Sequence, residues 1–132
     1  VMDAAFEHLV TWVREDRPPP RAEPLQVKTM LPELEFARDE FGNVLGGIRL
    51  AAHAVPVAKN TGMNSGTENR FCFLYGSHEP FPEALLDQLY PTHSDYVAKV
   101  RRVVGENLAD GYILPAAAER TLRAADASTI GR

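Results

Sequence analysis

Apolar residues recur every three or four positions near the start of the chain, and this spacing predicts a helix over residues 2–15. The stripe consists of Met2, Ala5, Phe6, Leu9, Val10, Trp12 and Val13. The helix must end before Pro18, because proline lacks an amide donor and disfavours helix in the preceding residue. We expect this wide apolar stripe to bury against a sheet or another helix.

The same spacing predicts helices over residues 83–90 and 95–109, with a third starting near Pro115. Their expected boundaries are marked by cap and turn residues, namely Pro91, Thr92, Gly111 and Pro115. Residues 124–132 lose the apolar spacing, so we expect the C-terminal end to fray.

The middle of the chain alternates between apolar and polar positions, which is typical of strands. Residues 16–33 hold five prolines and predict an extended connector with one short strand at 25–29. Residues 34–58 predict β structure, beginning with the alternating Leu34, Phe36 and Arg38. A turn at 39–43 follows, and the pair Gly46-Gly47 indicates a bulge or a close backbone approach.

The stretch between this β structure and the C-terminal helices is less regular. Residues 59–70 are polar and contain glycine, which predicts an exposed loop. Residues 71–75 form a short apolar run, read as a buried strand or as a segment laid against a neighbour.

Composition narrows the class of protein. The chain has 132 residues and a net charge of −4, so it is one domain or a piece of a larger one, with no basic face for nucleic acid. Its single cysteine, Cys72, excludes an intrachain disulfide and zinc sites with several cysteines. No apolar run approaches the ~18 residues of a membrane span. Gly42, Gly46 and Gly47 match neither a phosphate loop nor a dinucleotide motif, so no cofactor is expected.

The residues that could carry chemistry form no recognised catalytic pattern. No serine has glycine two positions away on both sides, as the nucleophile elbow of serine hydrolases requires. His8, His53 and His93 are interpreted as structural. His78 stands in a sequence with Ser77 and Glu79, but adjacent residues of an extended segment point to opposite sides. We therefore interpret Ser77, His78 and Glu79 as part of a turn, with a small independent enzyme as the weaker alternative. We assign no catalytic, cofactor-binding or metal residue.

The order of the segments resembles the C-terminal end of an α/β-hydrolase, in a poorly characterised bacterial branch of that superfamily. Residues 12–15, followed by the prolines 18–20, look like the last helix of that fold and its exit. The most specific part is Asp39 with the glycine-rich residues 42–50. The resemblance continues through residues 54–58, 61–62, 76–77, 80–81, 96–97, 110–115 and 118–120.

The resemblance implies a serine ester hydrolase whose Ser-His-acid triad would precede Val1, so that no residue of this chain has a triad role. It implies α+β structure for the chain as it stands. The last core helix would be at 1–15, a proline-rich connector at 16–33, and an appended β-hairpin with two or three helices at 34–132.

Two functions remain open at this stage. The first is a structural region that covers the sheet of a serine hydrolase and shapes its substrate entrance. Its partner would then be the remainder of the hydrolase core, on the same or a separate polypeptide, or a second copy of the chain. The second is a free-standing interaction module, not an enzyme, that binds a partner through the apolar face of helix 2–13. Neither function involves a nucleic acid or a membrane.

Overall fold

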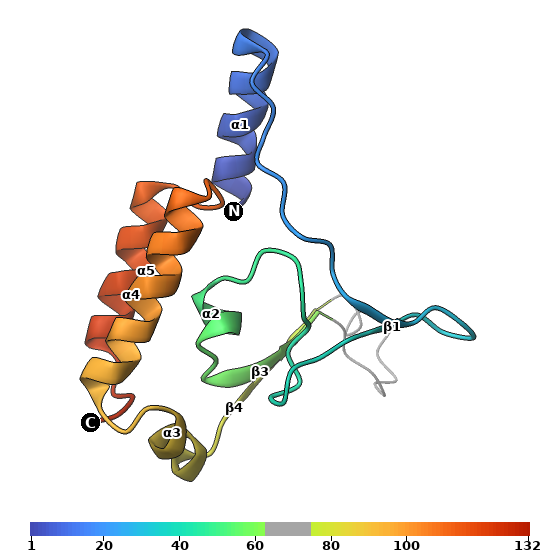
Figure 1. Ribbon diagram of the computed structural model, residues 1–132. Helices are drawn as coiled ribbons and strands as arrows, with labels where there is room; N and C mark the ends of the chain where they lie inside the picture. Colours follow the sequence, from blue (N-terminus) through green and yellow to red (C-terminus); the bar gives the residue numbers. More distant parts are fainter. Residues whose placement is uncertain (63–74) are drawn as a thin grey trace.

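Two C-terminal helices carry most of the buried core. The computed structural model describes residues 1–62 and 75–132, in which α4 (His93–Ala109) and α5 (Pro115–Ala127) lie side by side (Figure 1). Burying their apolar stripes is the main favourable contribution to the fold. The buried core residues are Val55, Tyr90, Val97, Val100, Val103, Val104, Ile113, Ala118 and Ala125.

The expected helix boundaries are confirmed where cap chemistry marks them. The Thr92 hydroxyl accepts a hydrogen bond from the Asp95 amide at 3.1 Å, which satisfies one of the free donors at the start of α4. Gly111 has a φ of +76° in the turn after α4, and Pro115 is at the start of α5. A shorter helix, α3 (Glu83–Leu89), precedes α4.

The C-terminal end is ordered, so the prediction of fraying over 124–132 is wrong. Helix α5 continues to Ala127, and Ile130 then packs against the core. The Ile130 carbonyl lies 2.9 Å from His93 Nδ1. Gly131, with a φ of +69°, passes so close to the Thr92 backbone that a Cβ there would clash.

Two small antiparallel sheets fill the middle of the molecule. Strand β1 (Val27–Thr29) pairs with β2 (Glu35–Phe36), and β3 (Ala58–Thr61) pairs with β4 (Ser77–Pro80). A four-residue helix, α2 (Ala51–Ala54), lies between these sheets and α4 (Figure 1). Helices and small antiparallel sheets together make this an α+β chain, as predicted.

Two expectations for residues 34–58 are wrong in detail. The β structure predicted through residue 58 is limited to β2 and single bridges, and His53 lies in α2 rather than in a strand-like run. The physical reason is Arg49, whose guanidinium binds the carbonyls of Val44 and His53 that a strand would present to a neighbour. Glycines with positive φ at 46 and 47 also break extended geometry.

Residues 59–61, expected in a loop, and the predicted turn around residues 77–79 are instead the paired strands β3 and β4. Each strand satisfies the backbone groups of the other, which outweighs the turn-forming tendency of the local sequence. Ser65, Cys72 and residues 71–74 of the apolar run lie outside the described residues.

Helix α1 (Met2–Glu15) forms as predicted, but its apolar stripe does not bury against the described chain. Val13 is 79% exposed and Phe6 is 64% exposed, whereas Ala4, on the opposite side, is buried. The first half of α1, as far as His8, lies near the turn between α4 and α5, and the C-terminal half projects away (Figure 1).

Candidate functional site

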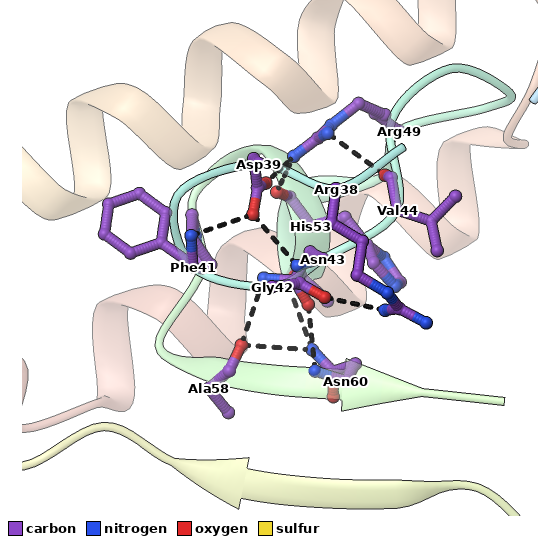
Figure 2. A network of polar contacts seen from close by, with 12 residues as sticks. Arg38, Asp39, Phe41, Gly42, Asn43, Val44, Arg49, His53, Ala58 and Asn60 are labelled. Atoms are coloured by element: carbon purple, nitrogen blue, oxygen red, sulfur yellow. Dashed lines mark hydrogen bonds and ion pairs between the residues drawn. The ribbon is translucent and has the colours of Figure 1, made fainter. Parts of the chain in front are cut away.

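The densest polar network of the described chain is built around Asp39 and Arg49 (Figure 2). One Asp39 oxygen accepts hydrogen bonds from the amides of Phe41 at 3.1 Å and Asn43 at 2.9 Å, which closes the turn over 39–43. The other oxygen lies 2.7 Å from Arg49 Nη2. Both carboxylate oxygens are therefore engaged within the protein.

These contacts set the charge of Asp39. Burial by itself raises the pKa, but the hydrogen bonds from Arg49, Asn43 and Phe41, together with the Arg49 charge, outweigh it. The pKa of Asp39 is consequently lowered from its ordinary value of 3.8. A carboxylate held ionised in this way is a poor general acid or base near neutral pH.

Asn43 connects the turn to the β3–β4 sheet. Its side chain is fully buried, and its Oδ1 accepts a hydrogen bond from the Asn60 amide at 2.8 Å. Its Nδ2 donates to the Ala58 carbonyl at 3.4 Å (Figure 2). A buried amide with both ends bonded fixes the position of the turn relative to β3.

Asn107 attaches the same region to α4. Its Nδ2 donates to the Arg49 carbonyl at 3.2 Å and to the Val103 carbonyl at 2.8 Å. The roles of Arg49, Asn60 and Asn107 were not predicted. Asn60 and Asn107 each bind a partner 17 or more positions away, and the Arg49 contacts, 4 to 10 positions away, form no recognised local motif. The turn at residues 39–43 was the one part of the network that the local sequence predicted.

His78 is oriented by Asn60. The Asn60 Nδ2 faces the carbonyls of Ala52 and Ala58, which only accept, so its Oδ1 is the atom 2.8 Å from His78 Nδ1. Because an amide oxygen also only accepts, Nδ1 of His78 must carry the proton in this contact. The imidazole is thus held in one tautomer on the exposed strand β4.

Ser77, His78 and Glu79 are not arranged as a catalytic relay. His78 binds Asn60, and Glu79 lies 3.6 Å from Lys59 across the sheet. The three residues succeed one another along β4, so His78 points to the opposite face from its two neighbours. A nucleophile and its base must instead meet in space.

The other histidines hold elements of the fold together. His8 Nε2 on α1 lies 2.8 Å from the Gly111 carbonyl, and both ring nitrogens of His93 face carbonyls of the C-terminal segment. These contacts agree with the structural interpretation of His8 and His93. Within residues 1–62 and 75–132, no group of three His, Cys, Asp or Glu side chains could hold a metal ion.

Two tyrosines have pKa values above the ordinary value of 10.0. Burial, with the neighbouring Tyr96, raises the pKa of Tyr90 to about 12, and burial raises the pKa of Tyr96. The Tyr90 hydroxyl donates to the Pro56 carbonyl at 2.8 Å. These phenols therefore stay protonated near neutral pH and serve the packing around α3 and α4.

The second candidate site is the α1 apolar face, defined as Met2, Phe6, Leu9, Val10 and Val13. All five side chains are about half exposed or more. Contiguous exposed apolar groups of this kind mark interaction surfaces. No helix of the described chain has the length and apolar character needed to cross a membrane.

Comparison with known proteins gives a family. The family model described as alpha/beta hydrolase domain matches residues 1–123, which is nearly the whole chain. No curated protein and no solved structure matches the chain. The match spans α1, both small sheets and most of α5. The chain therefore belongs to the α/β hydrolase domain family.

Proposed function

We propose that this chain is the C-terminal, non-catalytic region of a serine ester hydrolase, which covers the central sheet and shapes the substrate entrance. The observation that carries the proposal is the exposed α1 apolar face in a chain of the α/β hydrolase domain family. Helices of α/β folds bury such faces against a mostly parallel sheet. The sheets of the described chain are antiparallel and two-stranded, so they offer α1 no such surface.

The remainder of the chain supports a structural role. The α4–α5 core closes without α1, and the polar network joins residues 39–60 to α4. Such an appended unit can hold loops at the edge of an active site without contributing to the reaction itself. In this account the serine nucleophile, its histidine and acid, and the oxyanion hole all belong to the remainder of the hydrolase core.

A second candidate is a free-standing module that binds another protein through the same face. The closed α4–α5 core favours it, because a unit with its own core can fold independently. The two candidates differ in what lies against α1, which is a hydrolase sheet in the first and an unrelated protein in the second.

The coding sequence upstream of Val1 separates the candidates at little cost. Our proposal expects an open reading frame there, or a neighbouring one, that encodes a Gly-x-Ser-x-Gly segment. An unrelated gene with no hydrolase core nearby would favour the interaction module.

Hydrolysis of p-nitrophenyl acetate by the purified chain tests the catalytic part of the proposal. We expect no turnover above that of a Ser77→Ala variant, with thermal unfolding by circular dichroism recorded on the same samples. Turnover that is lost in Ser77→Ala while the fold is retained would show that the reaction is carried by this chain.

A further inference from the structure

An open groove lies beside the β1–β2 hairpin, away from the α1 apolar face. It has a volume of about 820 Å³ and is lined by Lys28, Leu34, Glu35, Phe36 and Arg38. Most of its lining side chains are exposed, so it is a groove on the surface rather than an enclosed cavity. Neither the polar network nor the proposed function uses this groove.

The lining places apolar groups and a cation in a row. Leu34, Phe36 and Arg38 occupy alternate positions along one stretch, which puts them on one side of an extended chain. At about 3.3 Å per residue, the row spans about 13 Å from Leu34 to Arg38. One end of the groove is thus apolar and the other carries a guanidinium group.

The charge of Arg38 is uncompensated among the described residues. Lys28 Nζ lies 3.0 Å from Glu35, so these two charges neutralise each other. The carboxylate next to Arg38 in sequence, Asp39, is paired with Arg49 instead. Arg38 uses Nη1 to donate to the Gly42 carbonyl at 2.7 Å, which positions the guanidinium and leaves its other N–H groups for a ligand.

We propose that this groove binds a monocarboxylate with an apolar chain. The carboxylate would accept hydrogen bonds from Arg38, and the chain would lie along Phe36 and Leu34. Charge complementarity supports this ligand, because the Arg38 guanidinium has no carboxylate partner among the described residues. The apolar side chains of Phe36 and Leu34 continue from Arg38 in the direction that the ligand's chain would follow. The site is independent of the proposed function, since it needs only residues of this chain.

Titration calorimetry of the full chain with octanoate and with 1-octanol tests the proposal. We expect octanoate to bind more tightly than octanol, because only the carboxylate can pair with Arg38. The Arg38→Gln variant should weaken octanoate binding about tenfold and leave octanol unchanged. The Arg38→Lys variant, which keeps the charge, should retain part of the preference.

A matched control removes the Lys28–Glu35 ion pair, whose net charge is zero, and leaves Arg38 unchanged. The double variant Lys28→Gln with Glu35→Gln should keep the preference for octanoate, whereas Leu34→Ser should weaken both probes. Circular dichroism establishes that each variant is folded. Equal binding of the two probes, no binding of octanoate, or equal losses for both probes in Arg38→Gln would overturn the proposal.

Discussion

At the residue scale, the partly buried ion pair between Asp39 and Arg49 should contribute more to stability than the exposed ion pairs of the chain. Its side chains are only 16% and 26% exposed, so water screens the pair less than it screens an exposed pair. Because the backbone amides of the turn bind the same carboxylate, one side chain holds both the turn and the guanidinium. Removing its charge would leave Arg49 without a counterion.

We predict that Asp39→Asn lowers the free energy of unfolding by about 1–3 kcal/mol at pH 7. The lowered pKa of Asp39 contributes stability that is present above its ordinary value of 3.8 and is lost as the pH falls through the folded-state value. The difference between wild type and Asp39→Asn should therefore shrink as the pH falls from the ordinary value of 3.8 toward the folded-state value. Urea unfolding measured from pH 7 down to pH 3 checks this.

The exposed pair between Lys28 and Glu35 is the control, because surface ion pairs contribute little. Glu35→Gln should change the free energy of unfolding by less than about 1 kcal/mol at every pH. A pH-independent loss in Asp39→Asn would argue that the turn, rather than the charge, accounts for its role.

At the element scale, the structure distinguishes a glycine that the backbone requires from one that it does not. Gly46 has a φ of +79°, and a Cβ there would lie 2.2 Å from the Pro24 carbonyl oxygen. Gly105 lies inside α4, and a Cβ there would meet nothing within 4 Å. The close backbone approach predicted at Gly46-Gly47 is thus confirmed, because the segment bridges to Leu25.

We predict that Gly46→Ala destabilises the chain by at least 1–3 kcal/mol, because it combines backbone strain with a backbone clash. Gly105→Ala should stabilise it by roughly 0.5–1 kcal/mol, since alanine favours a helix interior. Thermal or urea unfolding of the two variants measures both signs. A stable Gly46→Ala would mean that the crossing between the connector and residues 45–47 is not formed in solution.

The same elements show what the sequence could predict. The helices followed from local signals, since apolar spacing, the Thr92 cap and the position of Pro115 act over a few residues. The strands β3 and β4 were missed because their stability comes from pairing residues that are 16 or more positions apart. The network was missed for the same reason, as Asn60 contacts Asn43 and Asn107 contacts Arg49.

At the scale of the whole molecule, exposed apolar surface is concentrated toward the N-terminal end. In the described chain, most of the large apolar side chains that remain exposed belong to residues 1–34, whereas α4 and α5 bury most of theirs. The amphipathic pattern of α1 predicted a buried apolar face, whereas this face is exposed in the described chain. A local pattern cannot specify which partner would cover it. We propose that the rest of a hydrolase core is that partner.

The proposed docking of α1 on a hydrolase core can be tested by complementation. The chain would be mixed with a separately expressed hydrolase core that ends before Val1, and p-nitrophenyl acetate hydrolysis would be measured. We predict that the chain restores or raises the activity of the core. A Phe6→Ser, Val13→Ser variant should fail to do so while unfolding at the same temperature as wild type, because both side chains are exposed in the chain alone.

The control variant Val100→Ala removes a buried side chain of the α4–α5 core rather than exposed side chains of α1. It should lower the free energy of unfolding by about 2 kcal/mol. If the α1 variant complements as well as wild type, or if the core is equally active without the chain, the proposed docking of α1 is contradicted. We predict that the α1 variant loses complementation while its fold stays intact.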